Sequence, residues 1–210
     1  MCWNETVSLN TFIVSVFTLC IVYYNNTYTK YKMSIFNNKW LYIFLLLSFS
    51  MQLVEFFIWR NIKNKYNSII TIFAFIIVFL QPIASLMLIT EKQIRNYMVG
   101  TYTFIGTLYV LYILQTKKFM STVSKTGHLQ WNIKINHYYF WIWLFFLLFS
   151  FFYEKQFILL FIALITLSIF VYREYTSSGS LWCWFINSIS ILLLVYLLFY
   201  LPFCENKSIC

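Results

Sequence analysis

The chain has 210 residues, of which 61% are hydrophobic and only 10% are charged, and its mean hydropathy is +0.74. Soluble domains carry about 25% charged residues, so this composition excludes a water-soluble globular protein. The formal net charge is +9, but the cations lie mostly in short segments between apolar runs, which favours anionic lipid headgroups, and not nucleic acid, as their partner.

Seven apolar runs follow one another along the chain, separated by short polar or charged breaks. Crossing the bilayer takes roughly 20 helical residues, so seven spans leave only about 70 residues for termini and loops. We therefore expect an all-α protein, a single integral membrane domain (1–210) of seven transmembrane helices with no soluble domain. The expected spans are about 8–24, 40–59, 68–89, 97–114, 137–153, 156–172 and 181–201.

An odd number of spans places the two termini on opposite faces of the membrane. Only Glu154 and Lys155 separate the fifth and sixth runs, so these form a very tight helical hairpin or one of them is tilted. Lysine and arginine divide eight to seven between the two faces, so the positive-inside rule does not orient the chain. Seven of the eight tryptophans map to the N-terminal face, which predicts an aromatic vestibule there or, alternatively, a one-sided interfacial belt.

Glu55 is the one acidic residue clearly inside an expected span. It shares a helix face with Gln52 and Trp59, and this face should point into the bundle because a carboxylate facing lipid is costly. On one interpretation Glu55 is a proton acceptor, a cation site or a ligand anchor. On the other it is a carboxylate near the end of its helix that pairs with Arg60 or Lys63.

The third span contains Gln81 followed by Pro82. Pro82 cannot donate to the carbonyl of Val78 and clashes with it, so we expect a kinked helix with a free acceptor. Gln81 or Ser85 could satisfy that acceptor; alternatively, the kink serves packing alone. Gln81 lies roughly 20 Å from the N-terminal face, too deep to touch Glu55 without a ligand or water between them.

His128 and His137 lie in or beside the loop before the fifth span. Their ordinary pKa near neutrality makes them plausible proton carriers, although a loop histidine is often simply solvated. Two histidines cannot supply a three-histidine zinc site, and the five cysteines have no metal-binding spacing. We expect neither a metal nor a cofactor.

Asn187, in the seventh span, carries an amide that is costly to leave unpaired.

These observations predict a polar and aromatic pocket that opens to the N-terminal face. The candidate ligand or ion residues are Gln52, Glu55, Trp59, Gln81, His128, Trp131, His137, Trp182 and Asn187.

Five different short motifs occur one after another along nearly the whole chain. They are Met1-Cys2-Trp3-Asn4, Gln52-x-x-Glu55-x-x-x-Trp59, Gln81-Pro82-x-x-Ser85, Gly127-His128-Leu129-x-Trp131 and Gly179-Ser180-x-Trp182-Cys183-Trp184. The set resembles an uncharacterised family of small polytopic membrane proteins from large DNA viruses and unicellular algae. The resemblance implies a multi-pass architecture in a host or virion membrane, and it carries no activity with it.

Three classes of function stay open. The leading prediction is transport or conduction of a small solute or ion, which a continuous polar path through the bundle would favour. A lipid-modifying intramembrane enzyme would use His128 and Glu55 as acid and base. It would need an enclosed pocket with a lateral opening toward the lipid. A structural or host-interacting membrane protein would have a dry, filled interior.

Overall fold

The computed structural model describes residues 4–116, 119–131 and 137–206. The long helices are α1 Glu5–Tyr28, α2 Lys39–Arg60, α3 Asn67–Leu86, α4 Lys92–Thr116, α5 His137–Tyr153, α6 Phe157–Arg173 and α7 Ser178–Val195. The shorter elements are the 3₁₀ segments η1 Ser34–Asn37 and η2 Tyr175–Ser177, strands β1 Thr122–Val123 and β2 Leu129–Gln130, the π-helical turn η3 Tyr196–Tyr200 and α8 Leu201–Asn206.

The expected all-α fold is confirmed, and α1 to α7 correspond one for one to the seven expected spans. Within the described residues, five helical segments are long and apolar enough to cross a membrane by themselves. The other two, α5 and α6, are apolar but have only 17 residues each. An antiparallel pair of strands, β1 and β2, lies between α4 and α5 and was not expected from the sequence; each strand is two residues long.

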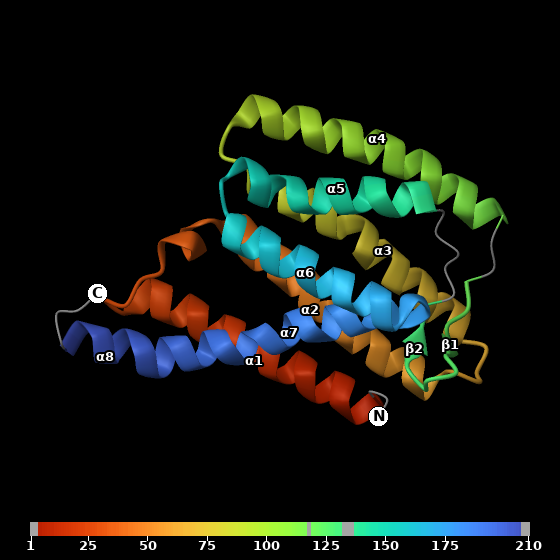
Figure 1. The fold of residues 1–210 in the computed structure, drawn as a ribbon, viewed down its shortest axis with the longest axis horizontal. Coiled ribbons are helices and arrows are strands. Elements are labelled where there is room, and N and C mark those ends of the chain that lie inside the picture. The colour runs from red at the N-terminus through yellow and green to blue at the C-terminus, as the bar shows by residue number, and fades with distance from the viewer. Residues whose placement is uncertain (1–3, 117–118, 132–136, 207–210) are drawn as a thin grey trace.

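The helices form one bundle (Figure 1). α2 packs on α3, α1 and α7; α5 packs on α3; α6 packs on α7 and α5; and α4 lies at the edge against α3. The start of α1 lies at the same end of the bundle as β1 and β2, whereas α8 lies at the other end (Figure 1). We call the end that holds the start of α1 and the strand pair the N-terminal end. Large apolar side chains such as Phe17, Phe104 and Leu192 are exposed on the outside, as a lipid-facing surface requires.

The turn between α5 and α6 is a tight helical hairpin, one of the two expected arrangements. Lys155 adopts the left-handed conformation, with φ 57°. The backbone N–H of Gln156 donates to the carbonyl of Phe151 at 2.8 Å, and that of Lys155 donates to Phe152 at 3.2 Å. This pair of hydrogen bonds is a Schellman motif, which ends a helix and reverses the chain within a few residues.

Pro82 lies inside α3 and leaves the carbonyl of Val78 without its helical donor. Trp143 of α5 supplies the missing donor, since its Nε1 lies 2.9 Å from that carbonyl oxygen. Ser85 donates instead to the carbonyl of Leu147 in α5, at 2.6 Å. The expectation of a partner within α3 is therefore wrong: the freed acceptor joins α3 to α5.

Asn67, at the start of α3, fastens the segment that leads into β1. Its Nδ2 donates to the carbonyls of Ile62 at 3.0 Å and Ser121 at 2.9 Å. Its Oδ1 accepts from the backbone N–H of Ser121 at 2.8 Å and from the hydroxyl of Thr71 at 3.1 Å. The amide is buried and uses both of its polar atoms, so it holds the strand pair against the N-terminal end of the bundle.

Candidate functional site

Gln52 and Glu55 form a buried polar pair on the inner face of α2. Gln52 is fully buried and Glu55 is 2% exposed. The Nε2 of Gln52 donates to Oε2 of Glu55 at 3.2 Å. The remaining oxygens, Oε1 of Gln52 and Oε1 of Glu55, are buried and have no hydrogen-bond partner among the described residues. Two polar atoms are therefore held in a low-dielectric environment with their bonding capacity unused.

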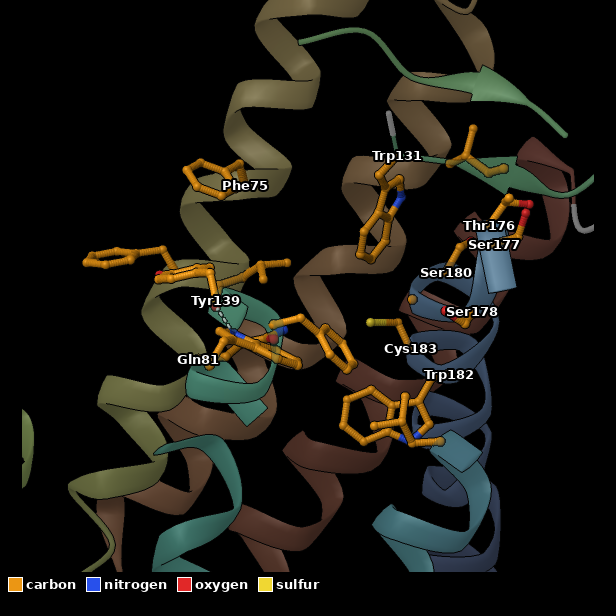
Figure 2. Close-up of a pocket in the computed structure, with 17 residues that line it drawn as sticks. Phe75, Gln81, Trp131, Tyr139, Thr176, Ser177, Ser178, Ser180, Trp182 and Cys183 are labelled. Atoms are coloured by element: carbon orange, nitrogen blue, oxygen red, sulfur yellow. Dashed lines mark hydrogen bonds between the residues drawn. The ribbon is translucent and has the colours of Figure 1, made fainter. Parts of the chain in front are cut away.

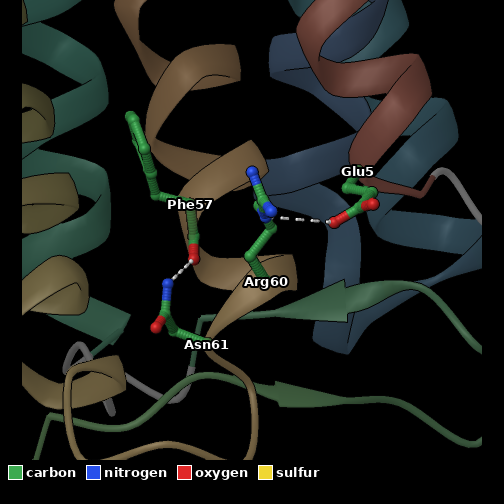
Figure 3. A network of polar contacts seen from close by, with 4 residues as sticks. All are labelled: Glu5, Phe57, Arg60 and Asn61. Carbon is green, nitrogen blue, oxygen red and sulfur yellow. Dashed lines mark hydrogen bonds and ion pairs between the residues drawn. The ribbon is translucent and has the colours of Figure 1, made fainter.

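In the described part of the chain, Glu55 forms no ion pair. Arg60, one of its two expected partners, lies on the exposed side of α2 and pairs with Glu5 of α1, with 3.8 Å between Arg60 Nε and Glu5 Oε2 (Figure 3). Both side chains of this pair are more than half exposed. The buried carboxyl group and the surface ion pair are thus separate features.

Three other side chains surround the carboxyl group of Glu55. Trp131, just after β2, and Ser180, in the first turn of α7, lie next to it. The free thiol of Cys183, one turn further along α7, also lies nearby. Gly179 allows this arrangement, since a Cβ atom there would lie 3.2 Å from Cζ3 of Trp131. Three of the five sequence motifs therefore meet around one carboxyl group.

Trp131, Ser180 and Cys183 also line a cavity of about 160 Å³ at the N-terminal end of the bundle (Figure 2). We call it the head cavity. Its walls come from α3, α5, α6, α7, η2 and the segment from β2 to Trp131. The aromatic lining residues are Phe75, Phe79, Trp131, Tyr139, Phe140, Trp143 and Trp182. Two polar atoms of its lining residues, Ser177 Oγ and Trp131 Nε1, are buried and find no hydrogen-bond partner in the described part of the chain.

A second cavity, of about 200 Å³, lies among α1, α2, α3, α5, α6 and α7. We call it the chain cavity. Its lining is largely aliphatic and aromatic, and it includes Asn187. The Nδ2 of Asn187 donates to the carbonyl of Cys183 at 2.7 Å, while its Oδ1 is buried without a partner. Gln81, Trp182 and Cys183 line both cavities.

The structure places eight of the nine predicted site residues in three groups. Trp131, Trp182, Gln81 and Asn187 line one cavity or both. Gln52 and Glu55 lie one layer behind the wall of the head cavity. Trp59 and His128 line neither cavity, although each has a buried ring nitrogen without a hydrogen-bond partner. His137 begins α5, and its side chain lies outside the described residues.

Sequence reasoning missed much of the aromatic wall of the head cavity. Phe75, Tyr139 and Trp143 lie on α3 and α5. In a chain with 23% aromatic residues, no spacing distinguishes them from ordinary lipid-facing or core aromatics. Ser177 was also missed, because it lies on a 3₁₀ turn whose place in the cavity wall depends on tertiary packing.

No group of three or more His, Cys, Asp or Glu side chains within the described ranges is arranged to hold a metal ion. No family model, curated protein or solved structure matches the chain. The resemblance to viral and algal polytopic proteins therefore stays a prediction. The chemistry of the site has to be argued from its own geometry, which joins a buried carboxyl group to an aromatic cavity.

Proposed function

We propose that this chain is a multi-pass membrane transporter for small organic cations, which it binds in the head cavity beside Glu55. The observation that carries the proposal is a buried carboxyl group, without an ion pair among the described residues, next to a cavity walled by aromatic rings.

Charge complementarity is the first support. A buried carboxylate is costly unless a cation or hydrogen-bond donors compensate it. Among the described residues, Gln52 donates to Oε2 of Glu55, the Ser180 hydroxyl and the Trp131 indole lie beside the carboxyl group, and Oε1 accepts no hydrogen bond by distance and angle. An ammonium group in the head cavity would supply the missing positive charge. Trp131 and Ser180 form the layer between that cavity and the carboxyl group, so the attraction acts across a single layer of side chains.

The aromatic walls are the second support. The faces of tryptophan, tyrosine and phenylalanine rings attract cations, by about 0.5–2 kcal/mol per contact. Trp131, Trp143 and Trp182 all line the head cavity. A bare inorganic ion would lose its hydration shell against such walls, whereas an organic cation gains both cation–π and apolar contacts. The walls therefore favour an organic cation over an inorganic one.

The size of the cavity limits the ligand. A cavity of about 150 Å³ holds one benzene molecule, and the head cavity measures about 160 Å³. A primary amine carrying one ring matches this volume. The presence of two cavities argues against a dry, filled interior and so against a purely structural protein.

Binding of phenethylammonium to the purified protein in nanodiscs tests the proposal, with tryptophan fluorescence as the readout. We expect saturable quenching by phenethylammonium and none by the neutral analogue 2-phenylethanol. Glu55→Gln should weaken binding by about 30-fold or more, because it removes one charge of a buried pair. Glu5→Gln is the matched control, since it removes an exposed carboxylate and should leave the affinity unchanged.

Transport is measured separately, as uptake of labelled phenethylammonium into proteoliposomes. We expect uptake that Glu55→Gln abolishes and Glu5→Gln preserves. Equal binding of the amine and the alcohol, or full binding by Glu55→Gln, would refute the cation site. Binding without uptake would refute transport and leave a receptor.

A further inference from the structure

We infer that the head cavity and the chain cavity together bind one single-chain cationic amphiphile, with its ammonium group beside Glu55 and its hydrocarbon chain in the chain cavity. The inference rests on the proposed function and names the substrate class of the same site.

The two cavities adjoin. Gln81 of α3 and Trp182 and Cys183 of α7 line both of them, so the boundary between the cavities is one layer of side chains. Figure 2 shows Trp131 and Trp182 on either side of Cys183. A chain that leaves the head cavity past these side chains enters the chain cavity without crossing a helix.

The two cavities differ in chemistry in the way that a head and a chain differ. Five consecutive residues that are either hydroxyl-bearing or glycine, Thr176 to Ser180, line the head cavity. In the chain cavity, the hydroxyls of Thr18 and Ser48 donate to backbone carbonyls of their own helices, at 2.9 and 3.0 Å. Those hydroxyls are therefore already satisfied, and the wall they present to a ligand is largely apolar.

The head cavity and the chain cavity together are also long. Along α7, residues that line one cavity or both extend from Ser178 to Leu193. Fifteen residues of helix rise about 22 Å. A space of this length and modest volume suits an extended chain better than a compact ring system.

The chain cavity lies close to the lipid. Leu159 and Ile162 of α6 line it, and each is 40% exposed on the surface of the bundle. One layer of side chains therefore separates the cavity from the bilayer at α6. An amphiphile dissolved in the membrane is close to this wall, whereas a fully water-soluble solute is not.

Photo-crosslinking locates the chain directly. The probe is a decylammonium with a diazirine at the end of its chain, applied to the protein in nanodiscs, and the adducts are mapped by mass spectrometry. We expect adducts on the chain cavity, for example at Ile189 and Leu193, which an excess of decylammonium suppresses. The same diazirine on decanol should label those residues no more than the lipid-facing surface of α4.

Filling the chain cavity separates the two proposals. Ala163→Phe places a ring in the chain cavity from α6. It should weaken displacement of phenethylammonium by decylammonium about tenfold, and leave the affinity for phenethylammonium itself within about twofold. Ser48→Leu fills the same cavity from α2 and serves if Ala163→Phe does not fold. Leu164→Phe, on α6 but outside the cavity lining, is the matched control.

Specific phenethylammonium binding with decyl adducts confined to lipid-facing residues would overturn the two-cavity site and leave the proposed function standing. The same holds if filling the chain cavity has no effect on decylammonium. Absence of Glu55-dependent binding for both amines would overturn the two proposals together.

Discussion

Two buried side-chain amides at the N-terminal end of the bundle differ in how fully they are hydrogen-bonded. Asn67 is 1% exposed and Gln52 is fully buried. Asn67 uses both polar atoms in hydrogen bonds to Ile62, Ser121 and Thr71. Gln52 makes one hydrogen bond to Glu55, and its oxygen accepts none.

The difference separates scaffold from site. A buried polar group without a hydrogen-bond partner costs about 1–3 kcal/mol, so each such group lowers the free energy of unfolding. Where the polar atoms are fully paired, as at Asn67, they fix one element to another. Where they are left open one layer of side chains behind a cavity, as at Gln52 and Glu55, a cation in that cavity can compensate the carboxyl group across the layer. The region of Pro82 belongs to the scaffold by this criterion, because the carbonyl of Val78 accepts a hydrogen bond from Trp143.

The largest effect on stability should come from Asn67→Ala. It leaves the buried N–H and carbonyl of Ser121 without partners, and we expect the free energy of unfolding to fall by about 3 kcal/mol. Unfolding in mixed micelles with increasing SDS measures it. Asn61→Ala is the control, because the Asn61 side chain bonds only the carbonyl of Phe57 at an exposed position, at 2.9 Å (Figure 3). A loss equal to that of Asn61→Ala would show that the Asn67 contacts do not hold the scaffold.

A smaller loss is expected for Trp143→Phe, which keeps an aromatic ring but removes the donor to Val78. The free energy of unfolding should fall by about 1.5 kcal/mol, the value of a buried hydrogen bond with its stranded acceptor. Trp141→Phe removes an indole from the same helix at a position that is 64% exposed. Its effect should be close to zero, and equal losses for the two variants would contradict a bridging role for Trp143.

Among the buried positions compared, the smallest effect on stability should come from Glu55→Gln, although it has the largest effect on binding. Glutamine keeps the volume and can still bond to Gln52, and removing an uncompensated buried carboxyl is often neutral or stabilising. We expect a change within about 1 kcal/mol in the same SDS unfolding assay. Arg60→Gln breaks an exposed ion pair, so its effect should stay within about 0.5 kcal/mol. A loss at Glu55 as large as that at Asn67 would assign Glu55 to the scaffold.

Much of the fold was predictable because hydropathy and chain breaks act locally. Each of the seven apolar runs became one helix, and the break at Glu154 and Lys155 became a helical hairpin. The β1–β2 pair escaped prediction because strands of two residues leave no alternating pattern. The turn between the strands contains Gly127 at φ 82°. The segment that leads into β1 is held by Asn67, which lies far from it in the sequence, so this contact has no local sequence signal.

The site was predictable in part. The i, i+3 spacing of Gln52 and Glu55 placed both side chains on one helix face, and both are buried. Their neighbours depend on which helices pack against α2, and single-chain hydropathy carries no information on that. The carbonyl of Val78 illustrates the limit. Its loss of a donor follows from Pro82, but the choice of Trp143 as its partner follows from the packing of α5 on α3.

The hairpin of α5 and α6 has a consequence for the membrane itself. Seventeen helical residues rise about 26 Å, against a hydrocarbon thickness of about 30 Å, and tilting would shorten their reach further. If this hairpin crosses a bilayer, local thinning or flanking side chains that reach the interface make up the difference, at a cost of fractions of a kcal/mol per Å. Thinning brings the headgroup layer closer to Leu159 and Ile162 on α6. An amphiphile with its headgroup in this lowered headgroup layer would have its hydrocarbon chain beside α6.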